Sequence, residues 1–210
     1  MGATEFTLYA TPVSVYSCKV RVGLALKGLD WVEVPPPGGY GSAEYRAIVP
    51  QGTVPALEHG GFVLAESEAI LEYLDEIGAG DPLLPGGPRG RARLRALSRF
   101  IDTRLEPAAR ALFPFVGGAP VPGALRDTVP RHLATLAQMA GPGPYLGGAD
   151  PALPDCGFFA VAEVLAMLAR ALALPLPDLT GPGRAHPVAG PILRAYGETL
   201  AGWAASKGAA

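Results

Sequence analysis

Residues 50–57 read PQGTVPAL, and this stretch decides how the first third of the chain folds. It is a turn punctuated by Pro and Gly that opens into an apolar run, which predicts a short strand over 54–58. A second apolar run, FVLA at 62–65, follows after a connection that contains two glycines. Two glycines between short apolar runs are typical of a β-hairpin. The stretch is therefore predicted to lead into a pair of antiparallel strands.

The segments before residue 50 alternate between strand and helix patterns. Residues 5–10 (EFTLYA) alternate in polarity and predict a strand, and residues 30–34 (DWVEV) predict a second one. Between them, residues 16–28 predict a helix that ends at Gly28. A loop of sequence PPPGGYGS then leads to a short helical segment around 43–48.

After the hairpin, Ser67 opens a helix as its expected N-cap, and Gly78 closes it. The order of elements over residues 1–78 is then βαβαββα. Residues 79–89 have the composition of a linker, because they are rich in Gly and Pro. From residue 90 to residue 210 we find only helical patterns, over 90–113, 124–140, 155–173 and 188–206. The chain is predicted to join a small α/β domain to an all-α domain.

Composition limits the class of protein. The chain has 210 residues, of which 49% are apolar and 17% charged, with a net charge of −2. A near-neutral chain of this kind is not expected to bind nucleic acid. Arg91, Arg95 and Arg99 are the exception, and a solvated face of an amphipathic helix accounts for them. No segment is long and apolar enough to span a membrane.

The two cysteines, Cys18 and Cys156, cannot form a disulfide framework, and no signal peptide precedes the first strand. We therefore expect a cytoplasmic protein. The three histidines show no metal-ligand spacing, so no metal site is expected.

Three segments together resemble one family. Residues 14–30 (SVYSCKVRVGLALKGLD) are similar to the first turn and helix of bacterial, zeta-class and theta-class glutathione transferases. Residues 50–57 resemble the family segment NPxGxVPxL, and residues 66–74 (ESEAILEYL) resemble ESxAIxxYL. The chain is identified by these motifs as a member of the cytosolic glutathione transferase superfamily, of the serine type. The resemblance implies a thioredoxin-like first domain, a helical second domain, glutathione as cosubstrate, and a homodimer.

The resemblance also implies site residues. Ser14 would be catalytic and would donate its hydroxyl to the glutathione thiolate, because the thiolate and not the thiol is the nucleophile. The family's cis-proline turn falls on Val54 and Pro55, whose backbone would pair with the cysteinyl part of glutathione. Glu66 and Ser67 would receive the ammonium and carboxylate of the γ-glutamyl part. Thr53 stands where the family often carries a Lys or Gln that reaches the glycyl carboxylate.

Other residues near Ser14 are weighed as alternatives. Tyr9 could act as a catalytic tyrosine, but the family tyrosine would align with Ala10, so Tyr9 is expected in the core. Ser17 and Ser14 occupy the two positions that hold cysteines in glutaredoxin-like relatives, which argues against disulfide exchange. Cys18 follows directly and is expected to point away from the site.

Three departures from the family pattern bear on function and stability. Val49 replaces a frequent Asn, and Thr53 weakens the expectation of tight glutathione binding. Ala152 replaces the hydroxyl residue of a helix capping box, although Asp155 remains. We expect a glutathione transferase that acts on a small hydrophobic electrophile. The alternatives are a glutathione-dependent isomerase or dehalogenase, similar to maleylacetoacetate isomerase, and a binding or scaffold protein without turnover.

Overall fold

The computed structural model describes residues 6–78 and 80–208, which form two compact units, Met1–Leu83 and Leu84–Ala210. The division falls inside the segment 79–89. The first unit carries every described strand, and the second contains only helices and loops. This is the expected class, a thioredoxin-like α/β domain followed by an all-α domain, and the prediction is confirmed.

The first unit is built on a four-stranded sheet in the order β2-β1-β3-β4. The central strand β1 pairs in parallel with β2 and antiparallel with β3, and β3 pairs antiparallel with β4. The strands are β1 (Phe6–Tyr9), β2 (Trp31–Val34), β3 (Ala56–His59) and β4 (Phe62–Ala65). Each lies within or beside the predicted range, because the alternation and the hairpin glycines mark it locally.

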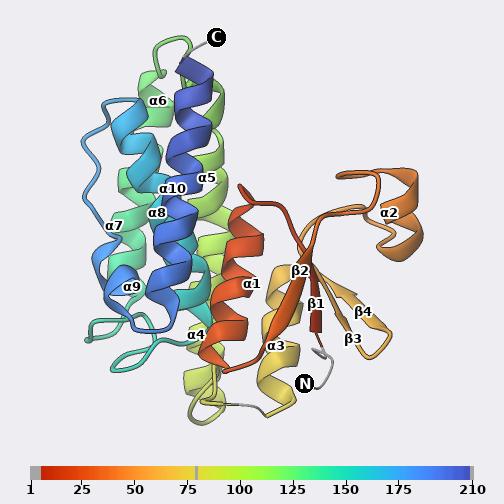
Figure 1. Ribbon diagram of the computed structural model, residues 1–210. Coiled ribbons are helices and arrows are strands. Elements are labelled where there is room, and N and C mark those ends of the chain that lie inside the picture. Colours follow the sequence, from red (N-terminus) through yellow and green to blue (C-terminus); the bar gives the residue numbers. More distant parts are fainter. Residues whose placement is uncertain (1–5, 79, 209–210) are drawn as a thin grey trace. The chain divides into compact units, whose positions relative to one another are not determined.

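Three helices complete this unit: α1 (Val15–Leu26), α2 (Ala43–Ile48) and α3 (Ser67–Glu76). Within the unit, α1 and α3 pack against each other on one side of the sheet, whereas α2 lies on the other side (Figure 1). Two ion pairs with buried lysines join α1 to α3. Lys19 Nζ lies 2.7 Å from Glu68 Oε2, and Lys27 Nζ lies 3.2 Å from Asp75 Oδ1.

The N-terminus of α3 differs from the prediction. Ser67 was expected to cap the helix, but it is the first helical residue, and Glu66 is the N-cap. Glu66 has a positive φ of 73° and its side chain forms no capping hydrogen bond. The backbone reverses sharply between β4 and α3, and Glu66 makes this turn. Glu66 therefore occupies the N-cap position that was expected for Ser67.

The second unit is a helical bundle around α8 (Leu153–Ala171), whose residues are buried on nearly all sides, as its apolar sequence predicts. The predicted helix over 90–113 is in fact a succession of α4, a π-helical turn and α5. A further short helix, α9, was not predicted, and its Arg184 forms a two-pronged ion pair with the buried Glu163 of α8. The other elements are α4 (Pro88–Phe100), η1 (Ile101–Leu105), α5 (Glu106–Arg110), η2 (Phe113–Phe115), α6 (Gly123–Arg126), α7 (Thr128–Met139), α9 (Gly181–Ala185) and α10 (Ala189–Gly208). Over the described ranges, none of the helices has both the length and the apolar character needed to cross a membrane.

Asp155 organises the start of α8. Its carboxylate accepts backbone N–H bonds from Leu146 at 2.8 Å, from Gly147 at 2.8 Å and from Ala152 at 2.9 Å. Burial raises the pKa of Asp155, and these backbone donors act in the opposite direction. The Ala152 bond is the half of the capping box that survives without a hydroxyl at the N-cap. The carboxylate thus replaces the missing cap and also pins the loop before the helix.

Replacing Asp155 should destabilise the fold strongly. Asp155→Ala is expected to lower the free energy of unfolding by about 3 kcal/mol, because three backbone donors lose their acceptor at roughly 1 kcal/mol or more each. Urea denaturation of the variant measures this loss. The exposed Asp150 supplies the control, and Asp150→Ala should change stability by less than about 0.5 kcal/mol. Equal effects of the two substitutions would show that the Asp155 network does not hold the helix.

Candidate active site

The strand register brings three loops to one edge of the sheet. Tyr9, the last residue of β1, pairs with Ala56, the first residue of β3, and Ala56 pairs with Ala65, the last residue of β4. These three residues form one row across the sheet, and neighbouring strands lie about 4.8 Å apart. The loops that leave this row carry Ser14, the segment before Ala56, and the start of α3. Residues more than 50 positions apart in the sequence, such as Ser14 and Ser67, therefore follow strand residues of the same row.

Ser14 lies at the N-terminus of α1. It is the N-cap residue with an extended backbone, and its Oγ accepts the backbone N–H of Ser17 at 3.1 Å. The side chain is half-buried. A hydroxyl that accepts a hydrogen bond still has its own proton to donate. Ser14 can therefore cap the helix and donate to an anion at the same time.

The segment before β3 contains the Val54-Pro55 peptide bond, which is cis as expected. Over residues 6–78 and 80–208, neither the N–H nor the C=O of Val54 forms a hydrogen bond. Its side chain packs against the cluster around Tyr9 and Tyr45. Thr53 is half-buried, and its carbonyl accepts the hydroxyl of Tyr45 at 2.9 Å. Both backbone groups of Val54 therefore remain available to a peptide-like ligand.

Glu66 and Ser67 stand at the start of α3. Ser67 is buried to 8% exposure, whereas Glu66 is exposed. The first N–H groups of a helix have no partner within the helix, so this end attracts a carboxylate. The adjacent Glu66 carboxylate offers a partner for an ammonium. Both ends of a zwitterionic amino-acid group therefore find complementary charge here.

The three alternative residues near Ser14 are all buried. Tyr9 is 9% exposed and donates its hydroxyl to Glu58 Oε2 at 3.0 Å, and it belongs to a core cluster, as expected. Burial, with help from Glu58, raises the pKa of Tyr9 and keeps it a neutral phenol. Ser17 and Cys18 are both fully buried, and the Ser17 Oγ has no hydrogen-bond partner in the described structure. None of the three presents a reactive group to solvent.

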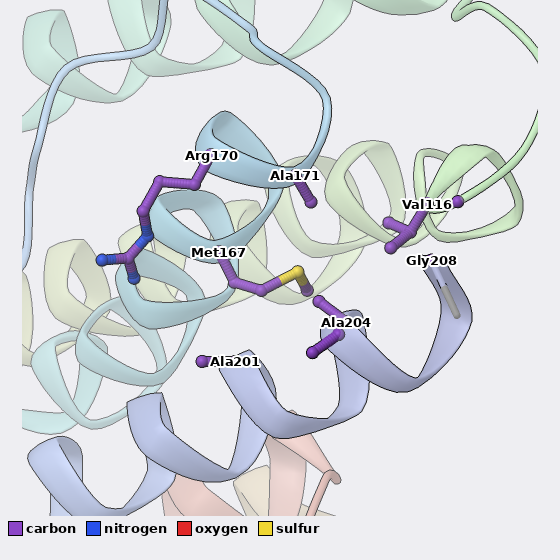
Figure 2. A pocket seen from close by; sticks show the side chains of 9 residues that line it. Val116, Met167, Arg170, Ala171, Ala201, Ala204 and Gly208 are labelled. Atoms are coloured by element: carbon purple, nitrogen blue, oxygen red, sulfur yellow. The ribbon is translucent and has the colours of Figure 1, made fainter.

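The helical unit contains an apolar hollow that the sequence did not suggest. Its volume is about 400 Å³, at the lower end of the range for ligand pockets. The Met167 side chain points into it between α8 and α10, while the Arg170 guanidinium points away (Figure 2). The remaining walls are small side chains and backbone from Val116, Gly117, Ala171, Ala201, Ala204, Ala205 and Gly208. Small alanines and glycines carry no recognisable motif, so sequence alone could not reveal the hollow.

Two features of the site itself were also missed. The Tyr45 hydroxyl reaches the carbonyl of Thr53, and Glu66 holds a backbone conformation that is rare for a residue with a side chain. In the sequence, a tyrosine in a short helical segment is indistinguishable from an ordinary core residue. No sequence signal predicts a positive φ at a glutamate.

For metals, no group of three or more His, Cys, Asp or Glu side chains that could hold an ion occurs among the described residues.

Comparisons with known proteins agree with this geometry. The family model described as glutathione S-transferase, N-terminal domain, matches residues 8–82. A glutathione S-transferase of Pseudomonas putida is 31% identical over 156 residues, which cover 72% of this chain and 70% of that protein. The maleylacetoacetate isomerase of Rattus norvegicus is 38% identical over 112 residues, or 51% of this chain. That match spans 52% of the isomerase, so the chain aligns with about half of it.

Similarity to solved structures extends over both units. The crystal structure of a Tau-class glutathione S-transferase from mango, Mangifera indica, superposes with a TM-score of 0.83 at 22% sequence identity. The match covers 98% of this chain and 100% of that one. At this identity the likeness concerns the fold.

The backbone at Glu66 generates a stability prediction. A residue with a side chain at φ 73° carries strain of about 1–3 kcal/mol, which glycine does not. Glu66→Gly should therefore raise the free energy of unfolding by about 1 kcal/mol, even after the greater entropy of unfolded glycine is subtracted. Thermal denaturation tests it against Glu66→Ala, which removes the carboxylate and keeps the strain. A destabilised Glu66→Gly would mean that the side chain itself holds this turn together.

Proposed function

Because this chain belongs to the glutathione S-transferase family, we propose that it is a glutathione transferase that activates glutathione as a thiolate for attack on a small hydrophobic electrophile. The observation that carries the proposal is that Ser14, at the N-terminus of α1, and the Val54 backbone, which forms no hydrogen bond in the described residues, lie in segments that leave the same row of the sheet. Glutathione is the cosubstrate, no metal takes part, and the cytoplasm is the proposed location.

Ser14 is the proposed catalytic residue. A thiol near neutral pH is mostly protonated, so catalysis requires that the protein stabilise S⁻. A hydroxyl that donates to a charged acceptor contributes roughly 1.5–3 kcal/mol, or about one to two pKa units of the bound thiol. The dipole of α1 adds to this at the same point. Ser14 acts as a donor here, and neither accepts a proton nor attacks the substrate.

The remaining contacts of glutathione follow the edge of the sheet. Val54 and Pro55 would pair with the cysteinyl unit in the manner of an added strand, and Glu66 with Ser67 would hold the γ-glutamyl group. Thr53 would face the glycyl end with a hydroxyl in place of a longer basic or amide side chain. This shorter side chain favours a modest affinity for glutathione.

A second candidate is a glutathione-dependent isomerase. The observation in its favour is the 38% identity to rat maleylacetoacetate isomerase over 112 residues, or 51% of the chain. The two functions share the thiolate and differ in what it attacks. Assays of one preparation with 1-chloro-2,4-dinitrobenzene and with maleylacetoacetate distinguish them, since conjugation consumes glutathione and isomerisation returns it.

The Ser14 assignment is tested by substitutions that separate capping from donation. Ser14→Ala should lower turnover near neutral pH roughly 10- to 150-fold, the equivalent of one hydrogen bond to a charge. The loss should shrink as pH approaches about 8.5, where a free thiol ionises without help. Ser14→Asp keeps an acceptor for the Ser17 N–H but repels the thiolate, so it should be folded and inactive. The pH profile of conjugation measures the loss of donation in each variant, and the melting temperature measures the loss of capping.

Neighbouring residues provide the controls. Ser14→Thr should retain most activity, because it keeps both the acceptor and the proton. Ser17→Ala should keep activity and gain some stability, since it removes a buried hydroxyl without a partner. Cys18→Ala should change turnover little. If activity disappears in Cys18→Ala and persists in Ser14→Ala, the chemistry lies on the cysteine.

We also propose a homodimer, in which the α/β domain of one subunit packs on the helical domain of the other. Charge supports this pairing. The helix α4 carries five arginines and no acidic residue, whereas α3 carries four acidic residues and no basic one. Two of the α3 acids, Glu68 and Asp75, pair with Lys19 and Lys27 of the same unit, whereas Glu76 is exposed at the end of the helix.

The dimer should respond to salt. Association that depends on opposite charges weakens as the Debye length falls, from roughly 14 Å near 0.05 M salt to about 4 Å near 0.5 M. Sedimentation equilibrium at micromolar concentration should therefore show a dimer whose dissociation constant rises with salt. Arg93→Glu in α4 should weaken it further, and Arg126→Glu in α6 should not. A monomer at every salt concentration contradicts the proposal.

A further inference from the structure

The short helix α2 is hydrogen-bonded to the segment that carries the free backbone of Val54. We call residues 50–54 the docking segment. The hydroxyl of Tyr45, in α2, donates to the carbonyl of Thr53 at 2.9 Å. This is a contact between side chain and backbone across eight positions of the sequence. It falls on the peptide group that directly precedes the cis bond.

Peptide geometry turns this contact into a constraint on Val54. The Thr53 carbonyl and the Val54 N–H belong to the same planar peptide unit, and in a trans unit they point in opposite directions. The Thr53–Val54 bond is trans, since the cis bond described in this unit is the next one. The Tyr45 hydroxyl draws the carbonyl toward a fully buried side chain. The Val54 N–H is consequently turned away from the core.

Tyr45 is well suited to hold this direction. Its side chain is 0% exposed and packs with Tyr9, Val49 and Ala56, with the Tyr9 and Tyr45 ring centroids 5.7 Å apart. Desolvation by burial raises the pKa of Tyr45 to about 12, so the phenol remains a donor at every physiological pH. A donor on a rigid, buried ring fixes its acceptor more firmly than a mobile surface side chain would.

Arg46, the next residue of α2, secures the other end of the docking segment. Its guanidinium donates to the carbonyls of Pro50 at 3.3 Å and Gln51 at 3.1 Å, and also to Gly41 at 3.1 Å before the helix. The side chain lies over Gly52, where an added Cβ would meet the guanidinium carbon at 3.0 Å. Gly52 has φ +67° as well, so both its conformation and this close approach call for glycine.

We propose that Tyr45 and Arg46 are positioning residues that make α2 a clamp on the docking segment, with Tyr45 aiming the Val54 N–H at the ligand. The inference rests on the proposed function for the identity of that ligand, glutathione. Neither side chain needs to touch it. The clamp acts by keeping one peptide unit in the orientation that an added strand requires, so that binding does not first have to order it.

Tyr45→Phe tests the clamp, because it removes one oxygen and keeps the buried ring. The Kd of glutathione, measured by calorimetry, should rise roughly 3- to 10-fold, the range for loss of one hydrogen bond. The kcat and the KM for 1-chloro-2,4-dinitrobenzene, both measured at saturating glutathione, should stay within about twofold. Every site is then occupied, so a weaker affinity for glutathione no longer limits the rate. Tyr40→Phe is the matched control, because Tyr40 is 66% exposed in the loop before α2.

Hydrogen exchange at the Val54 amide provides a readout that does not depend on activity. In Tyr45→Phe glutathione should protect this amide less than in the unsubstituted protein. The Gly52 amide of the docking segment, which donates to the Val49 carbonyl at 2.8 Å, should exchange faster even without ligand. Arg46→Met keeps the aliphatic part of the side chain over Gly52. It should change amide exchange in the docking segment and the Kd of glutathione in the same directions as Tyr45→Phe. An unchanged Kd together with unchanged exchange in both variants overturns the clamp.

The two proposals fail in different ways. If the unsubstituted protein does not bind glutathione, the proposed function is wrong, while the exchange of the Gly52 amide in Tyr45→Phe still decides the clamp. If the protein binds glutathione and Tyr45→Phe lowers kcat without changing its Kd, Tyr45 does not act by positioning the docking segment.

Discussion

The register of β3 between its two antiparallel neighbours is the constraint on which the site depends. Only the pairing of Tyr9 with Ala56 and of Ala56 with Ala65 brings the ends of β1 and β4 and the beginning of β3 into one row. A slip by one residue would turn every side chain of the strand to the other face of the sheet. The cluster around Tyr9 and Tyr45 would then lose its core side, and the docking segment would move along the sheet edge.

Two ion pairs extend this order from the sheet to the helices. Lys19 meets Glu68 near the beginnings of α1 and α3, and Lys27 meets Asp75 near their ends, so the two helices run parallel. The ammonium groups are almost completely buried, and removing either partner would strand a charge in the core. Since Ser14 is the N-cap of α1 and Ser67 is the first residue of α3, these pairs also fix one helix N-terminus relative to the other.

Most of the fold could be predicted from the sequence, because its signals are local. Alternation at β1, the glycines before β4 and the apolar stripe of α3 each depend on a few adjacent residues. The π-helical turn and α9 were missed, since they depend on packing around α8 rather than on local pattern. The site followed the same rule. The motifs predicted the places of Ser14, Val54 and Ser67, but not the hydrogen bond from Tyr45 or the backbone of Glu66, which exist only once distant segments meet.

The burial of both cysteines has a consequence for a protein proposed to work on electrophiles. Cys18 and Cys156 are each 0% exposed, one packed within α1 and the other at the start of α8. A reagent that alkylates thiols can reach either of them only when its helix opens locally, which the surrounding core makes rare. The protein can therefore meet reactive compounds repeatedly while the thiol at risk belongs to the cosubstrate, which is released after each turnover, and not to the polypeptide.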